Sequence, residues 1–425
     1  MDPAVGRVAR DTPAAMQTAK PLRHTAPSRE PVHDPQIAIL RRVKHPDEPS
    51  APAAPQPMRV LRGDDQAPIG PLRHRQVALL GFGNQGRAHA LNLRESGISV
   101  LVGGRPTASG GRGQREAEAL GFEVADFPEA AARGDLIILA LPDESHAAVY
   151  AESIAKHARP GVTIGFLHGF SVRYGTVQPR QDLGVILVAP KGPGTTLRER
   201  YAMGQGIPAL IAVERESPAG DARQLALAWA NGIGSARAGI LETTFAHETE
   251  TDLFGEQTVL CGGLMGLVLA AYETLVERGY PPELAYIECC HEVKQVADLI
   301  YARGLAGMRA AISNTAEFGA FTAAPRVVDE GVRRTFASIL DEIRDGRFAH
   351  RMLADHAQGD AWFTAERRRA DHHPIEATGE RVRALMPWLN GESQRSAPST
   401  SSQPPHPSAP SADPHLHAPS LPPSP

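Results

Sequence analysis

The sequence predicts an α/β fold, in which a doubly wound parallel sheet is followed by a second domain made only of helices. Short apolar runs alternate with helix-like stretches as far as about residue 241, and this alternation is typical of βαβ units. One of these runs leads directly into a glycine-rich segment at 81–86. From Thr243 onward the pattern changes to long apolar helical segments without a convincing strand.

The length and composition indicate two folded domains with an extension at each end. A chain of 425 residues is long enough for two domains and additional material. Residues 1–57 are crowded with Pro, Ala, Arg and Ser, and 391–425 are rich in Ser and Pro, so both are predicted to be disordered. The sheet domain is expected to span 58–241 and the helical domain 242–390.

Charge and hydropathy exclude several classes of partner. With 44 basic and 48 acidic residues, the net charge of -4 gives no reason to expect nucleic acid as a ligand. The longest apolar run, Thr258 to Tyr272, is shorter than the roughly 20 residues that a bilayer requires, so we expect a buried helix and no membrane span. Three cysteines, an odd number, indicate reduced thiols and a cytoplasmic location.

The predicted strands are almost continuously apolar. Such runs are typical of parallel strands that helices cover on both faces. In chain order, the strands are expected at 76–80, 99–102, 136–141, 162–167, 185–188 and 209–213.

The first of these strands ends in a motif typical of nucleotide binding. The segment Gly81-Phe82-Gly83-Asn84-Gln85-Gly86 is a G-x-G-x-x-G that follows a strand and precedes a predicted helix at 87–95. In this setting the glycines permit a tight turn and let the backbone approach a pyrophosphate at the helix N-terminus. We therefore predict a Rossmann-type dinucleotide site. The alternative is a tight strand-to-helix turn that binds no ligand.

The end of the second strand favours NADP over NAD. An NAD enzyme usually has an acidic residue there, which binds the ribose 2′-hydroxyl. This chain has Gly103-Gly104-Arg105 instead, and Ser109, Arg112 and Arg115 follow. Arginine and hydroxyl donors suit a 2′-phosphate. A solvated basic loop is the alternative interpretation.

Further polar groups follow the ends of three later strands. They are Pro142-Asp143-Glu144, His168-Gly169 and Lys191-Gly192-Pro193-Gly194. Open α/β sheets bind ligands outside the carboxyl ends of their strands, so these groups are expected to face the cofactor crevice.

The helical domain contains two acidic pairs spaced i,i+4. Asp252 with Glu256, and Glu288 with Glu292, would each lie on one helix face, where like charges repel. Two such pairs within mostly apolar segments indicate that something cationic is held between them. A single pair of this kind is ordinarily a solvated helix face.

Several segments together resemble the ketol-acid reductoisomerases, over about residues 58–390. The resemblance rests on the glycine-rich segment at 81–86 and on four further motifs: Leu167-His168-Gly169-Phe170, Ala189-Pro190-Lys191-Gly192-Pro193-Gly194, Glu250-Thr251-Asp252-Leu253-Phe254-Gly255-Glu256-Gln257, and Ile312-Ser313-Asn314-Thr315-Ala316-Glu317-Phe318-Gly319. A single helical domain matches the shorter class (class I) of that family. In that class the helical domain is knotted and dimerises to complete the active site, which implies a homodimer or a higher homo-oligomer.

The resemblance implies roles for individual residues. It implies NADP(H), bound by 81–86, Arg105, Ser109 and Gly194, and two Mg²⁺ ions, bound by Asp252, Glu256, Glu288 and Glu292. Ser313 would contact the substrate, His168 and Lys191 would be polar groups of the catalytic site, and Glu248 would be a further acid near the metals. The pair at 288 and 292 would come from the partner subunit. Arg87 and Thr195 stand where the family usually has His.

The implied reaction has two steps and belongs to valine and isoleucine biosynthesis. An alkyl group of 2-acetolactate or 2-aceto-2-hydroxybutyrate migrates, and NADPH then reduces the product. We expect Lys191 and Glu256 to relay the hydroxyl proton. One alternative is a metal-independent β-hydroxyacid dehydrogenase that uses Lys294. Another is an inactive paralogue with an assembly role.

Overall fold

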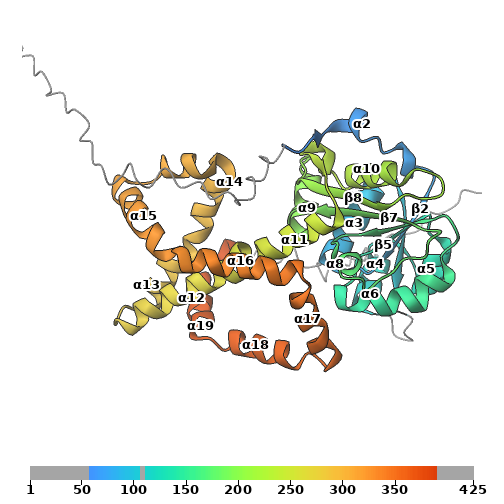
Figure 1. Cartoon of the computed structure of the whole chain (residues 1–425). Helices are drawn as coiled ribbons and strands as arrows, with labels where there is room; N and C mark the ends of the chain where they lie inside the picture. The colour runs from blue at the N-terminus through green and yellow to red at the C-terminus, as the bar shows by residue number, and fades with distance from the viewer. Residues whose placement is uncertain (1–56, 106–110, 390–425) are drawn as a thin grey trace, which may run out of the picture. The chain divides into compact units, whose positions relative to one another are not determined.

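The computed structural model describes residues 57–105 and 111–389 (Figure 1). Apart from residue 57, the two extensions predicted to be disordered lie outside these ranges, as does Ser109.

A single nine-stranded sheet organises the first part of the chain. Its strand order is β1-β9-β8-β7-β6-β5-β2-β3-β4. The strands are β1 (Val60–Leu61), β2 (Gln76–Leu80), β3 (Ser99–Gly104), β4 (Glu123–Asp126), β5 (Leu136–Leu139), β6 (Thr163–Phe166), β7 (Gly184–Pro190), β8 (Ala209–Arg215) and β9 (Ile240–Glu242).

All six predicted strands are confirmed, but the predicted sheet was incomplete and too uniform. The strands β1 and β9 were missed because two and three residues are too few to show periodicity, and β4 was missed because an acidic residue stands at each of its ends. The sheet is also not wholly parallel, since β7 pairs with β8, and β1 with β9, in antiparallel fashion. A strand that is buried on both faces reads as an apolar run whatever its direction, so the sequence could not distinguish the two cases.

Helices cover both faces of this sheet. They are α2 (Gly63–Gln66), α3 (Asn84–Glu95), α4 (Arg112–Ala119), α5 (Phe127–Arg133), α6 (Asp143–Val149), α7 (Ala155–His157), α8 (Phe170–Arg173), α9 (Gly194–Ala202) and α10 (Ala222–Gly232), with a π-helical turn at Tyr150–Ile154. Successive residues of β2 alternate between two core clusters, Val77 and Leu79 in one and Ala78 and Leu80 in the other. This alternation is the period of a strand that is buried on both sides.

From Phe245 to the end of the described residues the chain is helical. The helices are α11 (Phe245–Gly255), α12 (Gly262–Glu277), α13 (Pro282–Tyr286), α14 (Val293–Arg309), α15 (Asn314–Val327), α16 (Glu330–Arg344), α17 (Arg347–Ala357), α18 (Ala361–Asp371) and α19 (Pro374–Ala384). π-Helical turns at Glu256–Leu260 and Ile287–His291 follow α11 and α13. Each predicted acidic pair includes one residue of these turns: Glu256 lies in the first and Glu288 in the second. π-Helical turns are frequent at functional sites.

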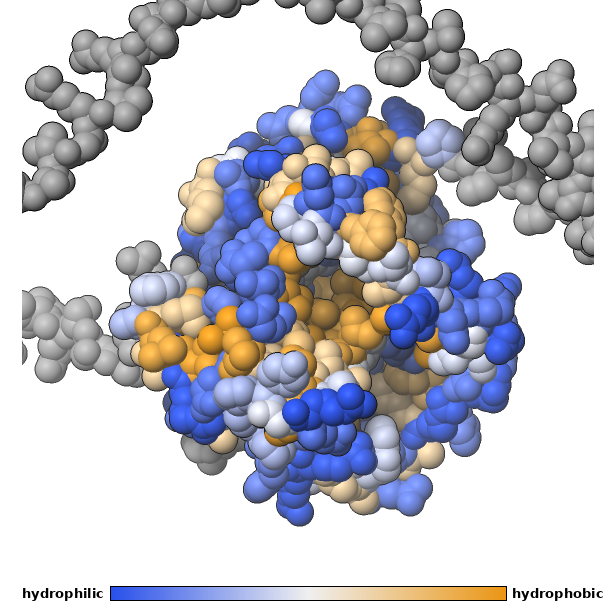
Figure 2. All heavy atoms as spheres, turned by 90° about the vertical axis from the view of Figure 1, so that its left-hand side faces the viewer, coloured by the Kyte–Doolittle hydropathy of each residue, from blue (hydrophilic) through white to orange (hydrophobic). Residues whose placement is uncertain are grey.

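The prediction that the run Thr258 to Tyr272 is buried is wrong for the single chain. Only its two end residues are buried, and the exposed side chains include Leu264, Met265 and Leu267. Figure 2 shows apolar side chains gathered around a hollow on this face. By length and composition alone, one continuous helical stretch of the described residues, Phe245–Glu277, could cross a membrane. No other part of the described chain covers this apolar surface.

Two buried histidines make the sheet domain sensitive to acid. His89 of α3 is fully buried and accepts a hydrogen bond from Trp229 Nε1 at 3.0 Å, and burial lowers its pKa to about 3. Burial likewise lowers the pKa of His146 to about 4. The unfolded chain binds these protons near pH 6.5, so the stabilisation is complete above that pH and is lost as the pH falls from 6.5 toward 3.

We therefore expect the free energy of unfolding to fall by about 0.7 kcal/mol per pH unit for each histidine near pH 6.5, and by close to about 1.4 kcal/mol per pH unit below about pH 5.5. Urea unfolding between pH 7.5 and 5 measures this slope. His89→Gln keeps an acceptor for Trp229 and should reduce the slope, whereas His74→Gln, at an exposed position, should not. Equal slopes in all three proteins would contradict the assignment.

Candidate active site

Glu248 lies at the centre of a cluster of charged groups. Its side chain is 1% exposed, and three donors surround its carboxylate. Oε2 accepts hydrogen bonds from Gly169 N at 2.9 Å and His168 Nδ1 at 3.1 Å, and Oε1 accepts one from Lys191 Nζ at 2.7 Å. Every donor around this buried carboxylate is either cationic or a backbone amide, so its negative charge is fully compensated.

Three elements bring the cluster together. His168 and Lys191 follow the ends of β6 and β7, which are parallel neighbours, so the two side chains emerge at the same edge of the sheet. Helix α11 supplies Glu248 and, one turn later, Asp252 on the same face. Lys191 Nζ donates to Asp252 Oδ1 at 2.8 Å and thus joins the two carboxylates.

Mutual compensation sets the protonation states. Burial alone would lower the pKa of His168, but the hydrogen bond and the charge of Glu248 outweigh it and raise this pKa to about 9. Lys191 is also partly desolvated, yet the charges of Glu248 and Asp252 raise its pKa. Burial opposes ionisation of Glu248, and its bond to His168 nevertheless lowers its pKa. At neutral pH His168 and Lys191 are therefore cations, and Glu248 is an anion.

Two other carboxyl groups near the cluster are harder to ionise. Burial raises the pKa of Asp143 to about 6, although the charge of His168 acts in the opposite direction. Glu256 has a largely exposed side chain, but desolvation of its carboxylate, together with the charge of Asp252, raises its pKa. Both groups are therefore better proton acceptors than an ordinary carboxylate.

The glycine-rich segment has the shape that a dinucleotide requires. Gly81 has a φ of 102°, and a Cβ there would lie 2.4 Å from the carbonyl oxygen of Ala140. A Cβ on Gly86 would lie 2.4 Å from the carbonyl oxygen of Gly81. Gly83, in contrast, caps the N-terminus of α3 and faces open space. Gly81 and Gly86 thus form the turn and its packing. Gly83 leaves room for a pyrophosphate to approach the protein backbone.

A second helix N-terminus packs beside this turn. A Cβ on Gly194 would lie 2.3 Å from the carbonyl oxygen of Asn84, so only glycine lets α9 approach α3 this closely. Gln85 Nε2 donates to the carbonyl oxygen of Gly192 at 2.9 Å and fixes this approach. Phe82 is buried and packs edge-on against Phe122. The segment that carries Lys191 is therefore tied to the predicted cofactor turn.

Two family models together match most of the chain. Residues 71–239 match the model described as acetohydroxy acid isomeroreductase, NADPH-binding domain, and residues 245–388 match ketol-acid reductoisomerase, C-terminal domain. The chain belongs to the ketol-acid reductoisomerase family. It is therefore an enzyme of the oxidoreductase and isomerase type in branched-chain amino-acid biosynthesis, with a nicotinamide cofactor and a small-molecule substrate.

One solved structure agrees with this family. An NADH-preferring ketol-acid reductoisomerase from an uncultured archean is 39% identical, with a TM-score of 0.75 over 77% of this chain and 99% of that one. A semialdehyde dehydrogenase NAD-binding protein from Cupriavidus necator, solved with calcium and NAD, is 22% identical, with a TM-score of 0.49 over 64% of this chain and 99% of that one. The second likeness is too distant to bear on function.

The acids that this family resemblance marks as metal ligands are not all together in one chain. Asp252, with His168 and Glu248, is part of a group whose potential ligand atoms lie within 4.8 Å of one another. Glu256 follows Asp252 by one turn. Glu288, in the π-helical turn Ile287–His291, and Glu292, directly after it, are exposed and are outside that group.

Two other predicted contacts also look different in the single chain. Ser313 is exposed and caps α15, where its hydroxyl accepts a hydrogen bond from Ala316 N at 3.2 Å. Lys191 was expected to work with Glu256, but its hydrogen bonds go to Glu248 and Asp252. The reason is the place of Glu256 on the helix, one turn farther along than Asp252.

The segment expected to recognise the cofactor 2′-group is only partly described. Arg105 and Arg112 are exposed on either side of residues 106–110. Arg87, which replaces the usual family histidine, forms an ion pair with Glu116 of α4 at 2.8 Å. Arg87 thus links α3, the helix that follows the glycine-rich turn, to α4.

Proposed function

We propose that this protein is a Mg²⁺-dependent ketol-acid reductoisomerase, which rearranges 2-acetolactate or 2-aceto-2-hydroxybutyrate and reduces the product with NADPH. The observation that carries the proposal is the Lys191 ammonium group, held between Glu248 and Asp252 at the carboxyl edge of the sheet. The glycine turn at 81–86 opens at the same edge. Hydride donor and polar cluster would then face one substrate.

The residues present fit a hard cation. Glu248 already accepts three hydrogen bonds, so it is a poor ligand, whereas Asp252 Oδ2 has only His168 nearby, at 3.6 Å. Asp252 and Glu256 would supply the carboxylate oxygens that Mg²⁺ prefers, and Glu288 and Glu292 of a second subunit would supply the remainder. When bound, a pair of Mg²⁺ ions polarises the ketone and stabilises an alkoxide.

The proton of the substrate 2-hydroxyl goes to Glu256 in this account. Lys191 is kept in its ammonium form by its two carboxylates and has no free pair to accept a proton. Glu256, one turn from Asp252 on the same stretch of helix, is the carboxylate proposed to accept it. The alkyl group then moves with its bonding electrons from C2 to the C3 carbonyl carbon, which leaves a ketone at C2 and an alkoxide at C3. The proton taken up by Glu256 returns to this C3 oxygen. Hydride from NADPH and one proton reduce that ketone to the 2,3-dihydroxy acid.

Product analysis tests the proposed reaction. The purified full-length chain is incubated with 2-acetolactate, NADPH and Mg²⁺, and the product is examined by proton NMR. The rearranged product carries both methyl groups on C3, whereas simple reduction leaves one on C2. We expect the rearranged skeleton. Unrearranged product would indicate a plain dehydrogenase, and no product would indicate an inactive paralogue. Lys294, the residue that a dehydrogenase would use, is exposed and pairs with Asp298 at 2.6 Å.

We expect NADPH to be preferred over NADH by about 10- to 100-fold in kcat/KM, since charged hydrogen bonds to a 2′-phosphate contribute about 1.5–3 kcal/mol. Comparing both cofactors at saturating 2-acetolactate gives the ratio. The double substitution of Arg105 and Arg112 by Ala should reduce this ratio. Arg73→Ala, at an exposed position elsewhere, should leave the ratio unchanged. A 39% identical relative prefers NADH, so both preferences are compatible with the reaction. A ratio below one would overturn the expected NADPH preference and leave the proposed reaction unaffected.

A second copy of the chain would cover the exposed apolar surface of the helical domain. This apolar patch comprises side chains of α12, α14 and α15 that a water-soluble subunit would not leave exposed: Leu264, Met265, Leu267, Val296, Ile300, Tyr301, Leu305, Phe318 and Phe321 (Figure 2). Glu288 and Glu292 lie in the turn before α14, so the same association would bring them to a partner's Asp252.

We expect the double substitution Leu264→Asp and Leu267→Asp to convert the oligomer to a monomer. Association would bury these carboxylates against the apolar side chains of the partner without a compensating charge, which is unfavourable. Light scattering after size-exclusion chromatography measures the mass. The monomer should lose turnover but keep NADPH binding. Met203→Asp, at an exposed apolar position of the sheet domain, is the control. A wild-type monomer with full activity would contradict the shared site.

A further inference from the structure

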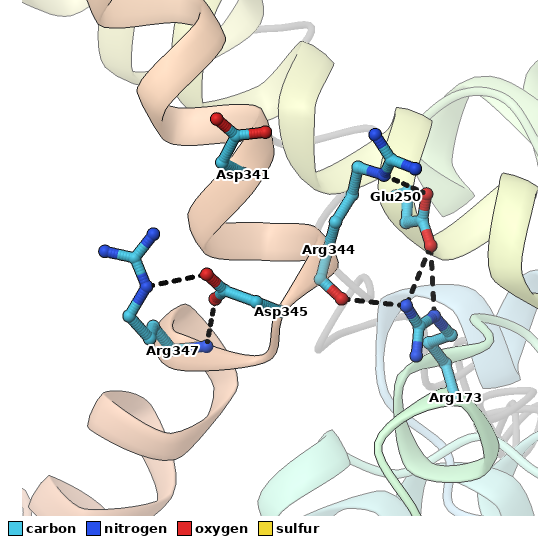
Figure 3. Close-up of a pocket in the computed structure, with 6 residues that line it drawn as sticks. All are labelled: Arg173, Glu250, Asp341, Arg344, Asp345 and Arg347. Carbon is cyan, nitrogen blue, oxygen red and sulfur yellow. Dashed lines mark hydrogen bonds and ion pairs between the residues drawn. The ribbon is translucent and has the colours of Figure 1, made fainter.

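The helix that carries Glu248 and Asp252 has a second charged face. Glu250 lies two residues from each of them, which turns its side chain about 200° around α11. Its carboxylate is mostly buried and faces Arg173, whose Nε and Nη2 both donate to Oε1, at 3.1 and 2.9 Å. Figure 3 shows these residues with Arg344, which approaches Glu250 Oε2 to 3.7 Å.

Arg173 also binds the C-terminal end of helix α16. Arg344 is the last residue of α16, and its carbonyl oxygen accepts a hydrogen bond from Arg173 Nη2 at 2.9 Å. Tyr174 Oη donates to the carbonyl oxygen of Ile343, also at 2.9 Å. The carbonyl group of Arg344 lies at the helix end, past the last intrahelical donor, whereas that of Ile343 also accepts a hydrogen bond from Gly346 N. The guanidinium of Arg173 is favourable at that end of the helix. Beneath them, apolar side chains of α8, α11, α16 and α17 form a small core.

The segment from His168 to Arg173 is consequently fixed to α11 at both ends. At one end, Gly169 N donates to Glu248, and at the other Arg173 donates to Glu250. We propose that Arg173 and Glu250, braced by Arg344, are positioning residues that set the register of the His168 segment against the Glu248 and Asp252 face of α11. They act through the segment and the helix, without contact to substrate or cofactor.

This inference rests on the proposed function for its kinetic part only. The test compares Arg173→Met with two further proteins. Arg173→Lys keeps the charge but has one donor group in place of the fork. Arg347→Met removes an arginine that lines the same hollow and pairs with Asp345 rather than Glu250. Glu250→Gln keeps the shape of its side chain and serves as an independent route if Arg173→Met does not fold.

Hydrogen–deuterium exchange reports positioning without any turnover. In Arg173→Met and Glu250→Gln, we expect amide exchange to rise at least tenfold in peptides that cover 167–174 and 245–255 and to stay unchanged over 76–95. We also expect kcat to fall by about 10- to 100-fold, the effect of a slight misplacement of catalytic groups, with an unchanged Kd for NADPH. Arg173→Lys should recover part of kcat, and Arg347→Met should resemble wild type.

Two outcomes overturn the proposal. One is wild-type exchange and kcat in both Arg173→Met and Glu250→Gln. The other is a uniform rise of exchange across all peptides, which would show a general contribution to stability instead. Should the wild-type protein fail to convert 2-acetolactate, the proposed function fails, and the exchange comparison still decides the role of Arg173 and Glu250.

Discussion

Glu248→Ala is expected to lower the free energy of unfolding by about 3 kcal/mol at pH 7, since removing one member of a buried ion pair leaves uncompensated charge. His168 loses the carboxylate that accepts its hydrogen bond and keeps Asp252 at 3.6 Å, and Lys191 keeps its bond to Asp252. Urea unfolding measures the loss. Glu199→Ala removes an exposed carboxylate of the sheet domain and should cost less than about 1 kcal/mol.

The pH dependence of this loss identifies His168 as one of the cations. Its folded pKa of about 9 lies above the unfolded value of 6.5, so its stabilisation is complete below pH 6.5 and is lost as the pH rises through 9. The difference between wild type and Glu248→Ala should therefore shrink between pH 6.5 and 9. If the two proteins unfold alike at every pH, the buried cluster as described is incorrect.

Asp252→Asn is expected to reduce turnover of 2-acetolactate by at least about 10³-fold, because it would remove a proposed metal ligand together with an acceptor of Lys191. Isosteric replacement leaves the helix intact, so the Kd for NADPH at the 81–86 turn should change by less than about twofold. Steady-state kinetics and fluorescence titration of NADPH provide the two measurements.

Asp341→Asn is the matched control for this change. Asp341 is an exposed carboxylate of α16 that lines the hollow beside Arg344 and is separate from the cluster. It should leave both turnover and NADPH affinity unchanged. Parallel loss of turnover and NADPH binding in Asp252→Asn would mean that the carboxylate supports the fold rather than the chemistry.

The sequence predicted those parts of the site that continuous segments encode. The turn at 81–86 combines a strand, glycines and a helix within about twenty residues, so its geometry follows from local pattern alone. Strand ends likewise predicted that His168 and Lys191 emerge together, because parallel neighbours end at the same edge.

Contacts between distant segments were not predictable in the same way. The sequence marked Glu248 only as a further acid, yet it is the centre of the cluster, because burial and three donors from two loops decide its role. Glu250 begins one of the resemblance motifs but had no role there, and nothing in the sequence connected it with Arg173, since 77 residues separate them and each resembles an ordinary surface charge. Lone arginines and glutamates are mostly solvated, so only the fold distinguishes this pair.

The apolar run at 258–272 shows a further limit. Its composition predicts burial without specifying what buries it, and within one chain most of it stays exposed. Hydropathy cannot distinguish the interior of one subunit from an interface between two, because both remove the same apolar area from water.

The dependence of NADPH oxidation on Mg²⁺, with 2-acetolactate as substrate, tests the central claim most directly. The purified full-length chain is assayed at saturating NADPH with excess Mg²⁺ and again after complete chelation. If the carboxylates of α11 belong to a metal-dependent rearrangement site, oxidation should be fast with Mg²⁺ and fall to background without it. An equal rate in the chelated enzyme would contradict the metal-dependent account.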